Sequence, residues 1–278
     1  MPTWSIYKYS VNFNGKVVKL VSSKNISLKM HYCKFALKFI VHFHSVFSIT
    51  NLYMKKIILL SLLAIIICMV SCSKKRSGKP RVLVFTKTAG YIHSSIPKGV
   101  AAVQKLGIEN SFDVDTTSNA AFFNEDSLKK YAAVIFLNTT GDVLDHRQEI
   151  AFERYIQAGG GFAGVHAATD TEYDWGWYGR LVGAYFASHP KPQQAKFMIK
   201  DKSMAATSFF KDTVWHHTDE LYNFKKLNPD VQVLLTVDES SYEGGTNRAF
   251  HPMSWYQDYD GGRSFYTALG HTDECYTE

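Results

Sequence analysis

The stretch Arg81-Val-Leu-Val-Phe-Thr86 is an uninterrupted apolar run of the length expected for a buried β-strand. Residues 132–137 and 162–165 are runs of the same kind, and residues 112–115, in which Phe112 and Val114 alternate with two aspartates, form a short strand. Gly, Asn, Asp and Ser residues flank these runs, as they do between regular elements. The sequence therefore predicts four buried strands in the middle of the chain.

Helix signals separate these strands. Pro97 suits the first turn of one helix, and Asn124 suits the N-cap of a brief second one. Asp145 caps a third helix, whose apolar residues have helical spacing and which Gly159 and Gly160 end. Strands that alternate with helices predict an α/β fold with a doubly wound, mainly parallel sheet.

The pattern changes after residue 193. Short strand-like segments follow at residues 195–200, 231–237, 254–256 and 264–269. We expect them to add strands to the edge of the sheet and long loops to its mouth. The chain stops at Glu278 directly after a loop motif, so we also expect a C-terminal truncation.

Charge is distributed unevenly along the chain. Residues 1–79 contain 13 of the 31 basic residues and no acidic residue. Residues 80–278 hold the other 18 basic residues and all 25 acidic ones, a net charge of −7. The folded part is therefore acidic, which argues against a nucleic-acid partner.

A secretion signal is predicted at residues 54–72. Lys55 and Lys56 precede an apolar run at 57–70, which is too short for a comfortable transmembrane helix of ~20 residues. The run ends in Ser71-Cys72, which resembles the lipobox of bacterial lipoproteins. This resemblance implies lipid on Cys72, and residues 73–80 read as a flexible tether. The alternative is an uncleaved apolar anchor, and both predict a location in the cell envelope, facing the periplasm or the surface.

Residues 1–53 precede this signal, although a signal peptide works at an N-terminus. They show no sustained helical or strand period, so we interpret them as a non-native extension ahead of a start at Met54. A genuine extension is the alternative. Cys33 and Cys68 then lie outside the mature protein and Cys72 carries lipid. Cys275 alone remains, which excludes an intramolecular disulfide framework.

Sheet topology predicts where a ligand binds, because open α/β sheets bind ligands beyond the carboxyl ends of their strands. The loops there carry Tyr91 and His93, residues 138–140, and His166 with Asp170. Gly164-Val165-His166 has the strand-turn-helix placement of a nucleophile elbow, with His in place of Ser or Cys. Cysteine-dependent acyl transfer is therefore not expected.

The glycines at 159–161 do not predict a phosphate site, because they lie between a helix and the following strand rather than between a strand and the following helix. Histidines, carboxylates and aromatic residues gather downstream of residue 166 instead. A pocket of histidines and carboxylates supports general acid–base catalysis or a metal site. Aromatic faces beside carboxylates suit sugar rings.

Several motifs extend this picture across residues 81–278, and together they resemble the ThuA-like (trehalose utilisation) family. They are Thr88-Ala-Gly-Tyr-Ile-His-Ser-Ser95, Gly160-Gly-Phe-Ala-Gly-Val-His-Ala-Ala168, Asp170-Thr-Glu-Tyr-Asp-Trp175, Tyr178-Gly-Arg-Leu-Val-Gly183, Ser188-His-Pro190, Asp219-Glu-Leu-Tyr-Asn-Phe224, Tyr242-Glu-Gly-Gly245, His251-Pro-Met-Ser-Trp255, Gly261-Gly-Arg-Ser-Phe-Tyr266 and Gly270-His-Thr272. The resemblance implies a flavodoxin-like, class I glutamine amidotransferase-like fold without that class's cysteine. It also implies a role in the metabolism of disaccharides or their keto derivatives.

The first hypothesis is an enzyme that acts on a sugar as a hydrolase, lyase or isomerase. Its candidate catalytic residues are His93, His166, Asp219, Glu220 and His251, of which the three histidines are also candidate ligands for a divalent metal such as zinc. Its candidate substrate-binding residues are Tyr91, Asp170, Tyr173, Trp175, His189, Glu243, Trp255, Arg263 and His271, with the tryptophans stacking on sugar.

Two alternatives stay open. A sugar-binding lipoprotein without chemistry would keep the aromatic residues but would not need convergent histidines. A regulatory or scaffold domain is disfavoured by the acidic charge and by the export signal. The geometric discriminator is whether His93, His166 and His251 meet in one pocket.

Overall fold

The computed structural model describes residues 8–13, 16–21, 59, 61 and 78–277. The chain divides into two compact units, Met1–Lys75 and Arg76–Glu278. In the first unit β1 (Lys8–Phe13) and β2 (Lys16–Val21) pair as an antiparallel hairpin. This corrects the expectation of no strand period in residues 1–53, because polar and apolar residues alternate along β1. Cys72 and nearly all of the predicted signal segment lie outside the described residues. No helix in the described part of the chain is both long and apolar enough to cross a membrane.

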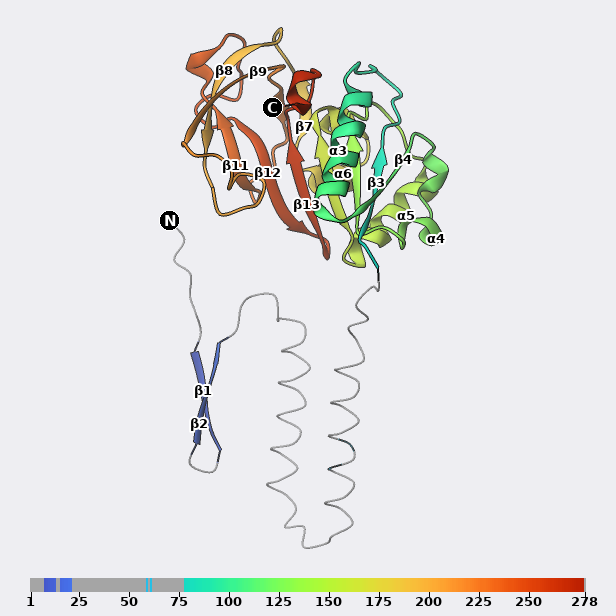
Figure 1. Cartoon of the computed structure of the whole chain (residues 1–278), viewed down its shortest axis with the longest axis vertical. Coiled ribbons are helices and arrows are strands. Elements are labelled where there is room, and N and C mark those ends of the chain that lie inside the picture. Colours follow the sequence, from blue (N-terminus) through green and yellow to red (C-terminus); the bar gives the residue numbers. More distant parts are fainter. Residues whose placement is uncertain (1–7, 14–15, 22–58, 60, 62–77, 278) are drawn as a thin grey trace, which may run out of the picture. The chain divides into compact units, whose positions relative to one another are not determined.

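The second unit is built on a nine-stranded sheet, and its five neighbouring parallel strands confirm the predicted α/β class (Figure 1). Their order is β4 (Asp113–Thr117), β3 (Arg81–Phe85), β5 (Ala133–Leu137), β6 (Gly161–Val165) and β13 (Gly262–Thr267). Strand β4 forms one edge of the sheet. Its Asp113 and Asp115 lie 3.9 and 3.4 Å from the Arg81 guanidinium.

Four antiparallel strands continue the sheet beyond β13. They are β12 (Pro252–Tyr259), β11 (Gln232–Val237), β8 (Gln193–Ile199) and β9 (Val214–Asp219). Separately, β7 (Tyr185–Ser188) and β10 (Asn223–Lys225) pair with each other. The extra strands were predicted, but the placement of residues 264–269 at the sheet's edge was wrong. Strand β13 lies inside the sheet, parallel to β6, so the loop that follows it joins the loops after β3, β5 and β6.

Helices cover both faces of the parallel half. They are α3 (Ile96–Asn110), α4 (Glu125–Leu128), α5 (His146–Gln157) and α6 (Gly176–Val182). The predicted caps are present: Asn124 accepts from the Ser127 N–H, and Asp145 forms a capping box with Gln148. Gly99 of α3 approaches Leu137 so closely that a Cβ there would lie 3.0 Å from it.

The neighbouring residue of β5 points the other way, as successive strand residues do. Phe136 stacks on Phe152 of α5 with ring centroids 5.5 Å apart. It also packs against Phe85, Phe123 and Phe162, all nearly or fully buried. Helices α3 and α5 therefore lie on opposite faces, and the aromatic core sits between α5 and the sheet.

Asn138 fixes the loops at the carboxyl end of the sheet. Its φ of 50° lies in the left-handed region, which Asn tolerates better than most residues. Its buried Nδ2 donates to Ser95 Oγ at 3.1 Å and to the Gly270 carbonyl at 3.2 Å. Ser95 Oγ also donates to Gly270, at 3.0 Å. One side chain thus ties together the loops that follow β3, β5 and β13.

We expect Asn138→Ala to lower the free energy of unfolding by about 2–3 kcal/mol, from about 1 kcal/mol for a lost hydrogen bond and 1–2 kcal/mol for a left-handed alanine. Asn138→Gly keeps the backbone relaxed and loses only the side-chain bonds, so it should cost less. Urea unfolding of both variants measures the difference. An Asn138→Ala protein as stable as wild type would show that these loops are held by other contacts.

Candidate functional site

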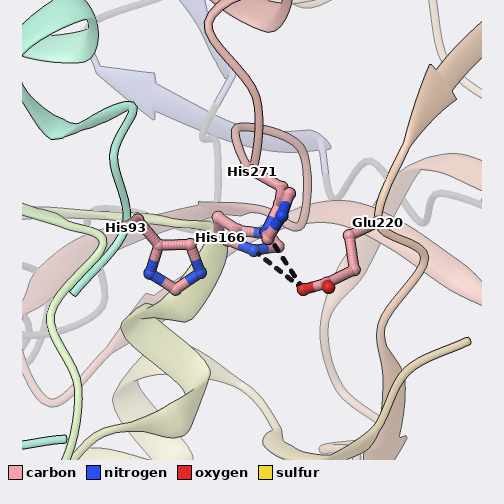
Figure 2. Close-up of side chains that lie close together, drawn as sticks. All are labelled: His93, His166, Glu220 and His271. Carbon is pink, nitrogen blue, oxygen red and sulfur yellow. Dashed lines mark ion pairs between the residues drawn. The ribbon is translucent and has the colours of Figure 1, made fainter. Parts of the chain in front are cut away.

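Four side chains from four loops converge beyond the carboxyl ends of the parallel strands. They are His93, His166, Glu220 and His271, and Figure 2 shows them facing one another. Each offers one nitrogen or oxygen atom, and these four atoms all lie within 4.8 Å of one another. They follow β3, β6, β9 and β13 in turn. The placement of His93 and His166 at the ligand mouth agrees with the predicted topology.

His166 is the first residue of a short 3-10 helix, His166–Asp170, that follows β6 directly. Its φ of 48° gives the backbone a sharp elbow, a strained conformation for a residue that is not Gly, Asn or Asp. Its Nδ1–H donates to the Ala268 carbonyl at 2.7 Å, since a carbonyl only accepts. This bond orients the ring so that Nε2 lies toward Glu220, 3.5 Å from its Oε2.

Glu220 is surrounded by histidines. Its Oε2 lies 3.2 Å from His271 Nδ1 and 3.5 Å from His166 Nε2, and its Oε1 lies 2.9 Å from His189 Nδ1. Burial acts to raise the pKa of Glu220, but the neighbouring His166 and His271 side chains outweigh it and lower the pKa to about 2. The side chain is therefore an ionised carboxylate at neutral pH. The nearby Glu220 carboxylate in turn raises the pKa of His271.

His93 closes the cluster from the β3 side and is only 4% exposed. Its ring meets those of His166 and His271 edge to face, with centroids 4.9 and 5.2 Å apart. Burial, followed by the charges of His166 and His271, lowers the pKa of His93 to about 3. The ring is therefore neutral. Tyr91 packs against its outer side with centroids 4.8 Å apart, and Tyr91 itself is 65% exposed.

Asp219 holds the backbone of the cluster residues through hydrogen bonds to its carboxylate. Its Oδ2 accepts from the Gly270 N–H at 2.8 Å, and its Oδ1 accepts from the Glu220 and His271 N–H groups at 2.8 and 3.3 Å. The side chain is fully buried, so these bonds are the means by which β9 holds the loop after β13. Asp219 positions two members of the cluster and is not one of its four members.

The cluster has the donor set of a metal centre. His93 Nδ1, His166 Nε2 and His271 Nδ1 are buried and make no aligned hydrogen bond, although the last two lie near Glu220. Buried polar atoms are normally satisfied, and His166 Nε2 and His271 Nδ1 lie together beside Glu220, so the cluster calls for a ligand. In a tetrahedral zinc site with bonds of about 2.0–2.2 Å, neighbouring N and O ligands lie about 3.3–3.5 Å apart. The 3.2 and 3.5 Å separations fit that spacing.

Polar and aromatic residues form the rim of the cluster. His189 is half-exposed beside Glu220. At the end of the 3-10 helix His166–Asp170, the Tyr173 hydroxyl donates to Asp170 Oδ1 at 2.6 Å, and Lys225 Nζ lies 4.5 Å from the centre of the Tyr173 ring. Burial raises the pKa of Asp170. Three of the predicted substrate-binding residues thus lie near the cluster, together with Tyr91.

His251 does not join the cluster, which corrects its assignment as a metal ligand beside His93 and His166. Its Nε2–H donates to the Tyr222 carbonyl at 2.8 Å, and its Nδ1 lies 2.8 Å from Glu239. The Tyr222 ring packs on His166 with centroids 4.1 Å apart, so Tyr222 stands between the two histidines. Both nitrogens of His251 have protein partners, and His271 fills the third histidine position of the cluster.

Three predicted substrate-binding residues, Trp255, Trp175 and Arg263, lie away from this cluster. Trp255 is 0% exposed, and its Nε1–H donates to the Val182 carbonyl, so it is a core residue that cannot stack on a sugar. Trp175 is half-buried and donates to Glu153. Arg263 lies near the amino end of β13, at the end of the strands opposite to the cluster. Glu243 is exposed in the loop before β12. Tyr222, which covers His166, was not predicted.

Comparison with known proteins agrees with this architecture. Residues 81–278 match the model of the ThuA family, described as trehalose utilisation. A ThuA-like protein from Bacteroides uniformis superposes with a TM-score of 0.61 at 20% identity, covering 74% of this chain and 89% of that one. A ThuA-like protein from Parabacteroides merdae gives a TM-score of 0.58 at 22% identity, over 70% and 80%.

No protein with a curated description matches the sequence. The two solved structures support the fold, and the family model covers most of the chain. The chain therefore belongs to the ThuA family.

Proposed function

We propose that this protein is an enzyme of carbohydrate metabolism that acts on trehalose, another disaccharide or a keto-sugar. The observation that carries the proposal is the convergence of three buried imidazole nitrogens and one ionised carboxylate at the mouth of the sheet. A protein that only binds sugar does not need such a group. Two of the three histidines expected to meet do so, and His271 takes the place of His251.

The cluster would hold a divalent cation through His93, His166, Glu220 and His271. When bound, such a cation supplies a Lewis acid for a carbonyl or hydroxyl oxygen of the sugar. Imidazole with carboxylate suits zinc and several other first-row metals. The Ala268 carbonyl orients His166. The Asp219 carboxylate accepts hydrogen bonds from three backbone N–H groups and thereby positions Glu220 and His271. These contacts keep the reacting groups in place.

Without a cation, the same residues can instead move protons. His271 carries a raised pKa and His93 a lowered one, so the pair offers a donor and an acceptor in one pocket. Groups whose environments push their pKa values apart are typical of acid–base catalysis. At the rim, Asp170, Tyr173 and His189 provide donors and acceptors for sugar hydroxyls. The exposed Tyr91 ring offers an aromatic face to a sugar ring.

The protein is also proposed to be exported and anchored by lipid on Cys72. Lys55, Lys56, the apolar run at 57–70 and the Ser71-Cys72 junction support this proposal. An envelope location suits the processing of a sugar taken from outside the cell.

Metal content and turnover test the site together. We expect wild type to retain about one equivalent of zinc at this cluster and to convert a disaccharide or keto-sugar in a substrate screen. His93→Ala and His166→Ala should each lower that occupancy by at least about tenfold and abolish turnover. His146→Ala, at an 84% exposed side chain, is the matched control. Sugar binding with equal turnover in wild type and His166→Ala would instead support a binding protein.

Stability against pH tests the neutral state of His93 in the metal-free protein. Its pKa is about 3 when folded and about 6.5 when unfolded, so the unfolded chain binds the extra proton between these values. The free energy of unfolding should therefore fall as pH falls below 6.5, by at most about 1.4 kcal/mol per pH unit from this group. In His93→Gln the slope between pH 6.5 and 5 should be shallower. Equal slopes would show that His93 is not buried in its neutral form.

Lipid attachment is tested by Cys72→Ser. The variant should lose incorporation of labelled fatty acid and leave the membrane fraction, because a serine cannot form the thioether. Cys275→Ser, at the other cysteine expected in the mature chain, is the control and should keep the label. Labelling that survives Cys72→Ser would refute the lipid anchor on Cys72 and would leave the proposal about the four-residue cluster unaffected.

A further inference from the structure

A second group of metal-ligating side chains is separate from the four-residue cluster and includes Asp219. It consists of His217 from β9, Asp219 at the end of β9, and Cys275 from the C-terminal 3-10 helix Glu274–Tyr276. One ligand atom from each lies within 4.8 Å of the other two. None of the four cluster residues belongs to this group. Cys275 was left without a role by the sequence and by the proposed reaction.

The distances within this group fit a metal site. Cys275 Sγ lies 3.5 Å from His217 Nε2. In a tetrahedral zinc site, with Zn–S of about 2.3 Å and Zn–N of about 2.0–2.1 Å, the two ligand atoms lie about 3.6 Å apart. His217 is 3% exposed, and its ring stacks on Trp215 with centroids 4.3 Å apart, which fixes its orientation. The sulfur and the nitrogen are thus already at ligand spacing.

Asp219 has capacity for one more partner on this side. A carboxylate oxygen accepts about two bonds, and Oδ1 already accepts from Glu220 and His271. Oδ2 accepts from the Gly270 N–H, and its second lone pair is available to the Cys275 side. The Cys275 thiol interacts with this carboxylate, and burial raises the pKa of the thiol to about 11. A proton therefore occupies the group unless a cation displaces it.

We propose that His217, Asp219 and Cys275 bind a second divalent cation of the zinc class, distinct from the cation at the four-residue cluster. A thiolate with an imidazole and a carboxylate selects zinc or cobalt over magnesium or calcium, which prefer oxygen alone. The thiol proton leaves to solvent when the cation binds. The site would tie the C-terminal 3-10 helix to β9, beside the carboxylate that positions Glu220 and His271.

Cobalt(II) substitution of the full chain tests this proposal, because a thiolate bound to cobalt gives a near-ultraviolet charge-transfer band. We expect this band in wild type, together with two equivalents of zinc or cobalt per chain. Cys275→Ser and His217→Gln should each lose the band and one equivalent. His93→Ala should keep the band and lose the other equivalent. His146→Gln, at an exposed histidine outside both groups, should change neither quantity.

A second measurement needs no variant. Zinc should protect Cys275 from alkylation by at least about tenfold in wild type, as read by peptide mass spectrometry, because the metal-bound thiolate is shielded. Three results would each overturn the proposal. They are a charge-transfer band and metal stoichiometry that do not change in Cys275→Ser, a single equivalent of metal in wild type, and alkylation of Cys275 at the same rate with and without zinc. Those results would leave a thiol hydrogen-bonded to Asp219. If His93→Ala loses turnover but keeps the charge-transfer band, that result concerns the four-residue cluster and bears only on the proposed function.

Discussion

The carboxylate of Asp219 is the interaction on which both groups of functional side chains depend. It is fully buried and accepts three backbone N–H groups, from Glu220, Gly270 and His271. A carboxyl group tolerates such burial only when hydrogen bonds replace its hydration. Those bonds join the last strand of the antiparallel half to the loop after β13, which belongs to the parallel half. The two halves of the sheet thus meet at the point where the chemistry is proposed.

The electrostatics of the four-residue cluster follow from the same burial. Low dielectric keeps His93 neutral, while the surrounding histidines keep Glu220 ionised. Three imidazole nitrogens without aligned hydrogen bonds are costly in a protein that binds nothing. Violations of the usual rules of burial are expected where function requires them. The strained backbone at His166 is a second such violation in the same place.

Local signals predicted the parallel half of the fold well. Apolar runs and capping residues such as Asn124 and Asp145 depend on neighbours a few residues away, and the structure confirms them. The positions of His93 and His166 followed from topology alone, because both follow parallel strands. Strand β9 was missed, since His216 and His217 interrupt its apolar pattern. The hairpin at β1 and β2 was missed because the polar–apolar alternation along β1 covers only six residues.

The membership of the site could not be predicted from local pattern, because it depends on which strands become neighbours. His271 joins the cluster because β13 inserts beside β6, and no local feature of residues 262–267 reports that insertion. His251 and Trp255 carry residue types typical of binding sites, yet β12 turns Trp255 into the core, and the Tyr222 backbone separates His251 from the site. Residue type alone does not distinguish a core histidine from a ligand.

The β4 edge of the sheet has a consequence for solution behaviour. An edge strand exposes unpaired N–H and C=O groups that can recruit a strand from another molecule. Here Asp113 and Asp115 alternate along that edge, and Arg81 on the adjacent strand partly balances them. A second copy approaching in register would bring like charges together and would have to strip water from them. The charged rim thus disfavours edge-to-edge aggregation at the boundary where the parallel half of the sheet is open.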